Sequence, residues 1–495
     1  KGLVKMHSRT LSVCTSDMLL YTTPVGDIAT KGVISAFQDI TIREAGEIMT
    51  KHEISSLVII DSNAVPVGIV TDRDFRKKVI AKGLDLNSNI SKIMSVSLIK
   101  SDAKEYCFEA LLKMIRYNIH HLLIVEDGKL KGIITNHDLM MLQGTSPLTI
   151  ARDIDSQYTV DGLATVSKKI NSVIDILIKQ GAKASNITKI ITEINDRIVK
   201  KILHFAEKRF GSPPLRYCWI AFGSEGRKEQ TFKTDQDNAI IYEDPESLEE
   251  DEAAKRYFQE FSEFVKDSLL RCGFPMCTGN YMASNPKWRQ PITVWKSYFT
   301  SWINTPNAHA ILTSVIIFDF RPIYGELSLA HELKNHLMKT LKGQDMFLVQ
   351  MARMTVNVKP PLSFFRTFVV ESSGEHKNML NLKFRCIAPL INIVRLFSLE
   401  KTIEETSTIE RIERLKKIHD TIREYGDELF HAFEFLMLLR IHLQFNQISE
   451  GKLPDNYINP DDLTNLQKKT LKESCQLILR LQESIETRYL LGRIS

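Results

Sequence analysis

An α/β multidomain protein is the fold class that the sequence predicts, and three observations predict it. The first 150 or so residues contain an internal repeat in which helical and strand patterns alternate. Two apolar runs between residues 219 and 242 flank a segment rich in glycine and acidic residues. From about residue 344 onward the pattern is almost entirely helical. Because the chain has 495 residues, it is too long for one core, and three or four domains are expected.

The repeat pairs two similar units. Each copy reads as a helix, a short buried strand, a turn, a second strand and a helix, with strands SSLVII and VGIVT in the first copy and HHLLIV and KGIIT in the second. Three positions at the end of the second strand recur: Gly68, Thr71 and Asp74 in the first copy become Gly132, Thr135 and Asp138 in the second. A threonine hydroxyl there can donate to a phosphate, and a carboxylate can accept from the hydroxyls of a ribose.

The two copies resemble a tandem pair of CBS domains, together a Bateman module, because the strand tails GIVTDRD and GIITNHD match the family's pattern. In that family the Thr and the Asp hold an adenosine nucleotide such as AMP or ATP. The resemblance therefore implies two ligand-binding pairs, Thr71 with Asp74 and Thr135 with Asp138, and it implies a homodimer. The alternative is that each pair simply caps the helix that follows it.

After the repeat the pattern becomes helical as far as about Gly211. Apolar residues recur at helical spacing over 170–178 and again over 187–198, with Gly181 between the two stripes. Pro213 and Pro214 then end the segment. We expect a helical connector here.

The stretch 219–242, which reads WIAFGSEGRKEQTFKTDQDNAIIY, has the most specific chemistry. Its first apolar run predicts a buried strand that ends in a turn, where the backbone N–H groups of Gly223 and Ser224 and the serine hydroxyl can face phosphate oxygens. Asp235 and Asp237 precede the second run, and in an extended chain residues i and i+2 point to the same side. Paired carboxylates suit Mg²⁺ that also binds substrate phosphates. The stretch predicts phosphoryl or nucleotidyl transfer.

The pattern of GS followed by DxD resembles the nucleotidyltransferase superfamily that includes DNA polymerase beta. The fuller string GSEGRKEQ…TDQDNAIIY is similar to the DUF294-type nucleotidyltransferases, which are related to the protein-PII uridylyltransferase. The superfamily has a third carboxylate on a later strand, and Asp319 in SVIIFDFRPIYGE matches it. The resemblance implies that Asp235, Asp237 and Asp319 are catalytic and hold two Mg²⁺ ions, or Mn²⁺. The alternative is a hairpin whose acidic turn is merely solvated.

The same resemblance assigns the phosphates of an NTP donor to Gly223 and Ser224. Arg227 would offset the charge on the departing pyrophosphate. The acceptor is unknown, and the likeness to the protein-PII uridylyltransferase implies that it is a protein hydroxyl.

Two features nearby have plainer explanations. Trp295, Phe299 and Trp302 would share one face of a helix, and such an aromatic stripe is more often core than a stacking platform for a base. The string HELKNH at residues 331–336 approaches the zinc-protease pattern, but its second His comes one position late, so the two imidazoles do not share a helix face.

The C-terminal region is predicted to be a helical bundle. Its phrases NLKFRCIAPLINIVRLFSLEK and KLPDNYINPDDLTNLQKKTL resemble the helical substrate-binding domain that accompanies DUF294-type enzymes. The predicted organisation is a leader at 1–16, which we expect to be truncated because the chain starts at Lys1, CBS domains at 17–82 and 83–148, a connector at 149–212, a nucleotidyltransferase domain at 213–343 and the helical domain at 344–495.

Composition narrows the function class. A formal net charge of +5 over this length is too small to argue for nucleic acid or a membrane surface, and no apolar run has the roughly 20 residues of a spanning helix. Seven cysteines without a CxxC pattern fit a cytoplasmic protein. We expect a nucleotidyltransferase controlled by nucleotide binding to the CBS pair. The alternatives are a catalytically inactive nucleotide-sensing scaffold and, less favoured by the charge, a transferase acting on tRNA ends.

Overall fold

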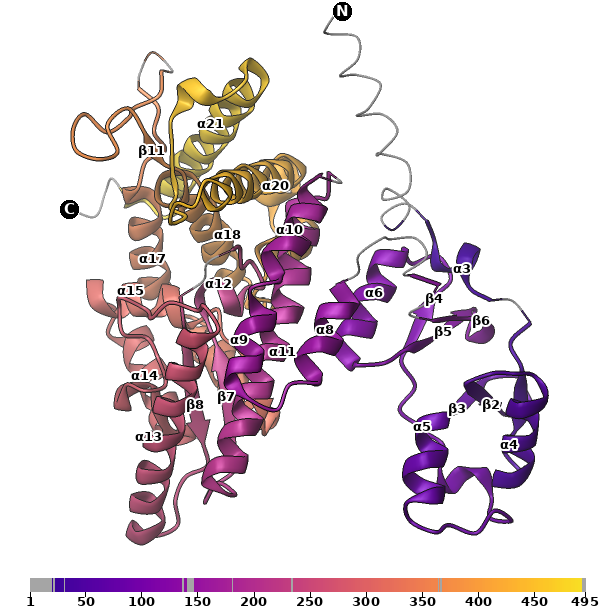
Figure 1. The fold of residues 1–495 in the computed structure, drawn as a ribbon. Coiled ribbons are helices and arrows are strands. Elements are labelled where there is room, and N and C mark those ends of the chain that lie inside the picture. Colours follow the sequence, from indigo (N-terminus) through magenta and orange to yellow (C-terminus); the bar gives the residue numbers. More distant parts are fainter. Residues whose placement is uncertain are drawn as a thin grey trace, which may run out of the picture. The chain divides into compact units, whose positions relative to one another are not determined.

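The computed structural model describes residues 20, 23–30, 32–135, 138–139, 147–179, 181–232, 235–363, 365 and 367–491. The chain divides after Arg152 into two compact units. In Figure 1 the first unit runs from indigo to purple and the second from purple to yellow. Both units combine helices with strands, so the predicted α/β multidomain class is confirmed.

The first unit contains the two repeats, each built around a three-stranded sheet. In each sheet the two predicted strands pair antiparallel, and a short strand that the sequence did not reveal pairs parallel with the first of them. The first copy consists of β1 (Ser35–Phe37), α4 (Ile42–Lys51), β2 (Ser56–Ile60), β3 (Pro66–Thr71), α5 (Asp72–Asp74) and η1 (Phe75–Ile80). The second consists of β4 (Lys100–Asp102), α6 (Cys107–Tyr117), β5 (His121–Glu126) and β6 (Lys129–Thr135).

The two cores of this unit do not follow the order of the chain. α3 (Val25–Ile28) precedes the first copy but packs in the core of the second, where Val25 and Ala29 lie with Cys107 and Ile134. η2 (Ile90–Lys92), which follows the first copy, completes the core of that copy. Each core therefore includes residues from a segment outside its own repeat. The predicted boundary between residues 82 and 83 does not account for these exchanged segments.

The second unit begins with four helices: α8 (Pro147–Asp155), which spans the boundary, α9 (Val160–Ser167), α10 (Ile170–Lys179) and α11 (Ala184–Phe210). The two predicted apolar stripes fall on α10 and α11, and all of their residues except the half-buried Ile178 are buried. α11 is 27 residues long, and it packs against α13 (Leu248–Arg271) and reaches the sheet of this unit at β10 (Arg321–Gly325).

The sheet of the second unit has the order β10-β7-β8-β9. The two apolar runs form β7 (Tyr217–Ala221) and β8 (Asn238–Tyr242), which pair antiparallel, and β9 (Arg289–Pro291) pairs parallel with β8. Helices cover both faces: Tyr217 contacts α13, and the next residue, Cys218, faces α16 (Leu327–Leu341). On the α16 side, α14 (Ile292–Asn304) brings Trp295 to the sheet, where its indole donates to the Ile240 carbonyl at 3.1 Å.

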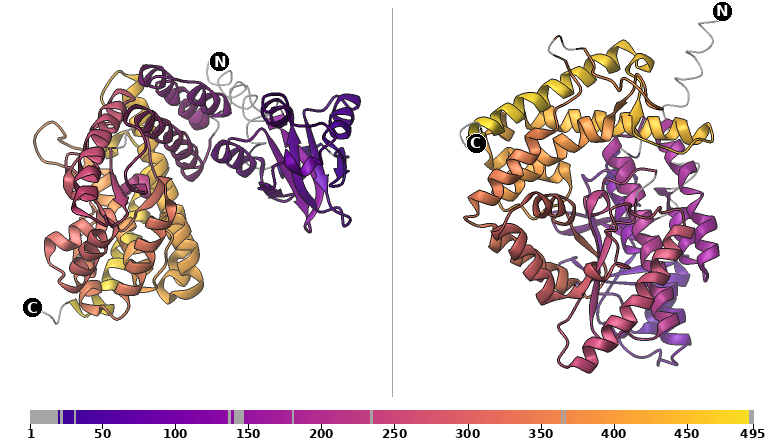
Figure 2. Two further views of the ribbon diagram at one scale, coloured as in Figure 1. Left: turned by 90° about the horizontal axis from the view of Figure 1, so that it is seen from below. Right: turned by 90° about the vertical axis from the view of Figure 1, so that its left-hand side faces the viewer.

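The rest of the second unit is helical, as predicted. Its elements are α12 (Gly223–Gly226), η3 (Pro286–Trp288), α15 (Ala308–Ile317), α17 (Asp345–Asn357), β11 (Leu380–Asn381), η4 (Lys383–Ile387), α18 (Ala388–Glu400), α19 (Thr408–Ile418), α20 (Asp420–Ser449), β12 (Tyr457–Ile458), η5 (Pro460–Asp462) and α21 (Asn465–Arg488). The helices from α17 onward, orange to yellow, gather at one end of this unit (Figure 2).

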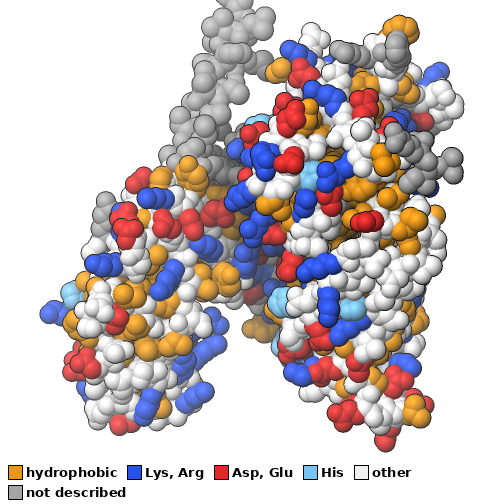
Figure 3. Space-filling model, turned by 180° about the vertical axis from the view of Figure 1, so that it is seen from behind, with side chains coloured by type: hydrophobic (Ala, Val, Ile, Leu, Met, Phe, Trp, Pro, Cys, Tyr) orange, Lys and Arg blue, Asp and Glu red, His pale blue; other side chains and the backbone are white. Residues whose placement is uncertain are grey.

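Among the described residues, no helix is long and apolar enough to cross a membrane. On the face drawn in Figure 3, acidic and basic side chains are interspersed with apolar ones.

Candidate active site

The turn between β7 and β8 requires glycine at two places. Gly223 has a φ of +61°, and a Cβ there would lie 2.5 Å from a carboxylate oxygen of Asp237. A Cβ on Gly226 would lie 1.8 Å from the backbone oxygen of Asp319. The turn is thus pressed against both acidic segments of the site. Among the described residues, no acceptor is found for the amide N–H groups of Gly223 and Ser224.

A second contact ties this turn to the long helix α11. Arg321 at the start of β10 donates both Nη groups to the carboxylate of Asp196 on α11, at 2.7 Å each. Its Nε donates to the backbone oxygen of Glu225 in the turn, at 3.0 Å. The Glu225 side chain is buried, and this burial, with Asp196 and Asp237 adding to it and Arg321 opposing it, raises the pKa of Glu225 to about 8.

The segment 235–237 continues the antiparallel pairing of β8 past the end of the strand. The Phe222 amide donates to the Asp237 carbonyl at 3.0 Å, and the Gln236 amide donates to the Pro275 carbonyl at 3.0 Å. The Gln236 side chain is fully buried and donates to the Phe274 carbonyl. Asp235 and Asp237, one residue to either side, both face one cavity, as the two-residue spacing predicted.

That cavity has a volume of about 440 Å³ and lies between the sheet and the C-terminal helices. Its floor combines the turn at Gly223 and Ser224 with the two carboxylates. Its other wall comes from α15, η4, α18 and α20, and is partly apolar: Val315, Ile316, Ile387, Ala388, Ile391 and Met437. The structure therefore brings together five of the six predicted residues of the transfer site: Gly223, Ser224, Arg227, Asp235 and Asp237.

Asp237 is partly buried while Asp235 is exposed. Burial is the largest cause that raises the pKa of Asp237, to about 6, and the neighbouring charge of Asp235 raises it further. The Cys277 thiol, Lys383 and Arg227 oppose this shift. Near neutral pH the two carboxylates therefore form an acidic pair in which ionisation of Asp237 is costly.

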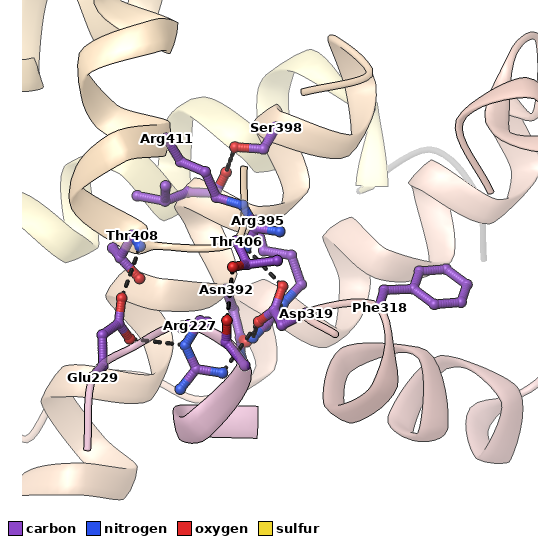
Figure 4. A network of polar contacts seen from close by, with 12 residues as sticks. Arg227, Glu229, Phe318, Asp319, Asn392, Arg395, Ser398, Thr406, Thr408 and Arg411 are labelled. Carbon is purple, nitrogen blue, oxygen red and sulfur yellow. Dashed lines mark hydrogen bonds and ion pairs between the residues drawn. The ribbon is translucent and has the colours of Figure 1, made fainter. Parts of the chain in front are cut away.

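Asp319, the sixth predicted residue, is not part of this cavity. The apolar run before it is the helix α15 rather than a strand, and Asp319 lies in the turn before β10 with no exposed surface. Three guanidinium groups surround its carboxylate: Arg395 donates to Oδ2 at 2.6 Å, Arg227 donates to Oδ2 at 3.1 Å, and Arg411 is 2.7 Å from Oδ1 (Figure 4). These contacts leave no face of the carboxylate toward Asp235 and Asp237.

The prediction that Asp319 joins the other two aspartates around metal ions stays a prediction, although Asp319 does not line the cavity that they face. Burial alone would raise the pKa of Asp319, but Arg395, Arg411 and Arg227 hold it well below its usual range. Within the described ranges, no group of three or more His, Cys, Asp or Glu side chains is arranged to hold a metal ion. Asp319 acts instead as the anion that gathers three arginines.

Arg227 lines the cavity, but its charge is already compensated. Its Nε donates to Glu229 at 2.8 Å, and its Nη1 donates to Asp319. Glu229 in turn accepts from the Thr408 amide at 2.7 Å, and the Thr406 hydroxyl donates to the Gly226 carbonyl at 2.7 Å (Figure 4). The C-terminal domain therefore holds the catalytic turn from the side opposite the sheet.

Three cations of the cavity were not identified from the sequence: Lys383 on η4, Arg395 on α18 and Arg440 on α20. They lie at least 146 residues beyond Asp237 in the chain (383 − 237), so no local spacing could connect them to it. The sequence held one weak indication of their role: Lys383 and Arg395 both fall within the phrase NLKFRCIAPLINIVRLFSLEK, which resembles the substrate-binding domain.

The residues present fit a divalent cation held by two carboxylates. The carboxylates of Asp235 and Asp237 provide hard oxygen ligands on one wall of the cavity. Ionisation of Asp237 is unfavourable in its buried surroundings, and a bound cation would make it less so. Asp235 and Asp237 alone do not provide the third carboxylate that the predicted two-ion site requires.

The other predicted features have plain structural roles. Trp295, Phe299 and Trp302 are buried together in α14, so the aromatic stripe is core. The second histidine of the HELKNH string, His336, has its Nε2 2.8 Å from the Thr300 hydroxyl.

In the first unit, each threonine and aspartate of the repeat bonds to the other. The Thr71 hydroxyl donates to Asp74 at 2.8 Å and the Thr135 hydroxyl donates to Asp138 at 2.8 Å, and Lys78 pairs with Asp74 at 2.9 Å. This is the helix-cap arrangement that was the alternative interpretation. A cavity of about 470 Å³ lies close by, lined by Ser55, Asp72 and Phe75 among others, and not by Thr71 or Asp74.

Comparisons with known proteins agree with this architecture. The family model described as "Putative nucleotidyltransferase DUF294" matches residues 168–309, and that described as "Putative nucleotidyltransferase substrate binding domain" matches residues 345–489. The CBS domain model matches residues 25–81 and 90–144.

Individual relatives match only part of the chain. It is 37% identical over 124 residues to L-aspartate semialdehyde sulfurtransferase of Methanocaldococcus jannaschii, a match that covers 25% of this chain and 23% of that protein. It is 36% identical over 118 residues to an uncharacterized 17.7 kDa protein of Acidianus ambivalens, covering 24% of this chain and 71% of the relative. A CBS domain pair solved with 5-methylthioadenosine and S-adenosyl-L-methionine is 35% identical and covers 24% of this chain and 98% of that one, with a TM-score of 0.23.

The chain thus spans about a quarter of the first of these relatives. The three family models together cover both units and fall on the elements described above. The chain belongs to the proteins that join a tandem pair of CBS domains to a DUF294-type nucleotidyltransferase domain and its substrate-binding domain.

Proposed function

We propose that this protein transfers a nucleoside monophosphate from an NTP to an acceptor hydroxyl, in the cavity between the sheet and the C-terminal helices. The observation that carries the proposal is the convergence of the Gly223–Ser224 turn with Asp235 and Asp237 in a cavity whose far wall is cationic and apolar. The family model for this part of the chain supports the same class of reaction.

The charges of the cavity complement an NTP bound with a divalent cation. The buried cluster of Arg227, Arg395 and Arg411 against Glu229 and Asp319 leaves one positive charge, since three cations meet two anions. Lys383 and Arg440 add two more on the same side. The triphosphate would face this wall, while the apolar positions of α18 and α20 offer a surface for the base.

The reaction forms a bond between the acceptor oxygen and the α-phosphorus, and breaks the bond from that phosphorus to the bridging oxygen, so that pyrophosphate leaves and the acceptor loses its proton. Asp235 and Asp237 would hold Mg²⁺ or Mn²⁺, which when bound supplies charge stabilisation at the reacting phosphate. The amide N–H groups of Gly223 and Ser224 are placed to donate to phosphate oxygens.

The acceptor that we propose is a protein hydroxyl. The proposal rests on the resemblance of the string GSEGRKEQ…TDQDNAIIY to the protein-PII uridylyltransferase and its relatives. The mixed charge of the surface in Figure 3 supports a protein acceptor better than a tRNA end, for which a basic stripe is expected.

We further propose that the CBS pair binds an adenosine nucleotide and controls the transfer. The family model over both repeats and the matched positions Thr71, Asp74, Thr135 and Asp138 support it. Because each Thr–Asp pair is closed on itself, binding there requires the ribose to replace a hydrogen bond between the two side chains. Control requires that the nucleotide bind the active and inactive arrangements with different affinity.

Label transfer tests the proposal. Each of the four α-³²P nucleoside triphosphates is incubated with Mg²⁺ and a cell lysate, and wild type is compared with Asp235→Asn/Asp237→Asn. We expect one donor to give a labelled protein band that the double variant does not produce. Label from no donor, with and without AMP or ATP, would contradict the proposed transfer.

One observation favours a second function, that of a catalytically inactive nucleotide-sensing scaffold. Asp319 is enclosed by arginines and does not line the cavity, and Glu229, which does line it, is paired with Arg227. Calorimetry with MgATP and MgUTP separates the two functions, because the scaffold predicts no metal-dependent binding in the second unit.

A further inference from the structure

The cations of the candidate active site fall into two groups. Arg227 and Arg395 already donate hydrogen bonds within the protein. Arg227 donates to Glu229 and Asp319, and Arg395 donates to Asp319 and Asn392. Both are held by hydrogen bonds from several directions. They shape the wall of the cavity, but a phosphate would have to compete with a buried carboxylate for their donors.

Arg440 differs from these two. It is 6% exposed, it lines the cavity, and its Nε donates to the amide oxygen of Asn456 at 2.7 Å. No carboxylate pairs with it, and across the described ranges no further partner is found for its two Nη groups. A buried guanidinium without a directly bonded carboxylate is costly. Desolvation together with the charge of Arg227 lowers the pKa of Arg440 to about 10, and the charge of Asp235 opposes this shift.

Lys383 is the second cation of this kind. It begins η4, a single π-helical turn, and such wide turns often occur at functional sites. Over the described part of the chain its Nζ has no hydrogen bond or ion pair. Desolvation lowers the pKa of Lys383 and the charge of Arg440 lowers it further, while Asp235 opposes both. Lys383 and Arg440 thus line one cavity with Asp235, and within the described ranges neither cation is paired directly with a carboxylate.

The π-helical turn and α18 together present one continuous face to the cavity. Its members recur at helical spacing, with a cation at each end and an apolar middle: Lys383, Ile387, Ala388, Ile391, Asn392 and Arg395. Arg440 reaches the same cavity from α20. The C-terminal domain therefore supplies both an apolar surface and the cations that remain available.

We propose that Lys383 and Arg440 hold the triphosphate of the donor nucleotide, so that the C-terminal domain, and not Arg227 of the catalytic turn, selects an NTP over its monophosphate. This inference rests on the proposed nucleotidyl transfer. It assigns the donor's polyphosphate to two residues of the C-terminal domain and leaves Arg227 and Arg395 as positioning residues that hold the wall.

The test compares Lys383→Gln and Arg440→Gln with Lys377→Gln, which removes the same charge from an exposed residue of the same domain outside the cavity. Calorimetry measures binding of inorganic tripolyphosphate, and of ATP, UTP and their monophosphates, with Mg²⁺ present. Charge-assisted hydrogen bonds predict a loss of about 10- to 100-fold in NTP and tripolyphosphate affinity for each cavity variant. Monophosphate affinity is expected to change less than threefold, and Lys377→Gln is expected to match wild type.

Removing the buried Arg440 could also disturb folding, so Arg440→Lys is measured alongside, with circular dichroism to check the fold. This variant keeps a charge but loses the planar fork, and we expect it to recover part of the NTP affinity. Equal NTP affinity in folded Lys383→Gln, Arg440→Gln and wild type would overturn the inference while label transfer still stood. A wild-type protein that binds no NTP at all would overturn the inference together with the proposed function.

Discussion

Asp237 and Asp319 are two aspartates against the same turn, and the protein uses them in opposite ways. Asp237 contacts Gly223, and its burial, together with the charge of the neighbouring Asp235, raises its pKa to about 6. Asp319 contacts Gly226 and meets three guanidinium groups, so its pKa falls well below its usual range. The negative charge is disfavoured at the first carboxylate, whereas three guanidinium groups compensate it at the second. Sequence position does not distinguish a reactive carboxylate from a structural one; the charges that surround it do.

The largest expected effect comes from removing the Asp319 carboxylate from its contacts with the three arginines. Asp319→Asn leaves three buried arginines against Glu229 alone, and we expect it to lower the free energy of unfolding by about 3–5 kcal/mol. Urea denaturation followed by tryptophan fluorescence measures this in the catalytic domain, because all four tryptophans lie between residues 219 and 302. Asp235→Asn, at an exposed carboxylate of the other group, is the control and should unfold like wild type. Equal stability of the two variants would contradict the structural role of Asp319.

The pH dependence of the same measurement has a defined sign. The pKa of Asp319 is lower in the folded protein than in the unfolded chain, so its contribution to stability is present above pH 4 or so and is lost as the pH falls further. Asp319→Asn should therefore flatten the acid side of the stability curve.

Removing the carboxylates of Asp235 and Asp237 should reduce the reaction without destabilising the fold. We expect Asp235→Asn/Asp237→Asn to reduce label transfer at least about 100-fold. Because the raised pKa of Asp237 makes ionisation costly in the folded state, Asp237→Asn should stabilise the protein by about 2 kcal/mol at pH 7.5, and this gain should vanish as the pH falls from about 6 toward 4. Thermal unfolding at the two pH values measures it, and a destabilised Asp237→Asn would contradict the assignment.

Protons and metal should compete at this pair. As the pH falls below about 6, Asp237 is protonated, and the apparent affinity for Mn²⁺ should fall by up to about tenfold per pH unit. Electron paramagnetic resonance counts free Mn²⁺ directly and does not depend on activity. A flat profile down to pH 5 would place the ion elsewhere, and Asp319→Asn, if folded, should keep the wild-type profile.

The smallest expected effect concerns the hydrogen bond from Thr406 of the C-terminal domain to Gly226 in the turn. Thr406→Val removes the hydroxyl that donates to the Gly226 carbonyl, and it should cost about 1 kcal/mol of stability without abolishing transfer. Thr470→Val on α21, which removes a hydroxyl that donates within its own helix, is the matched control and should cost less. Urea denaturation compares them, and equal losses would mean that the Thr406 contact does not hold the turn.

The sequence predicted the strands on either side of the turn because their apolar runs are local signals. It also predicted that Asp235 and Asp237 share a side, because alternation along an extended chain needs no tertiary information. The sequence did not reveal the arginines around Asp319, because Arg395 and Arg411 lie 76 and 92 residues further along the chain (395 − 319 and 411 − 319) and carry no pattern that points back to it. Arg440 was missed for the same reason: a buried arginine in an apolar helix looks like an ordinary interruption of the stripe.

The bidentate contact between Asp196 and Arg321 has a mechanical consequence. α11 is the helix through which the chain enters the catalytic domain, and the same guanidinium that grips it also holds the carbonyl of Glu225 inside the turn. The two hydrogen bonds of this ion pair fix the orientation of the two groups as well as the distance between them, because the guanidinium is planar. α11 is therefore tied to the turn through one guanidinium, and a displacement of Asp196 is expected to shift the Glu225 carbonyl with it.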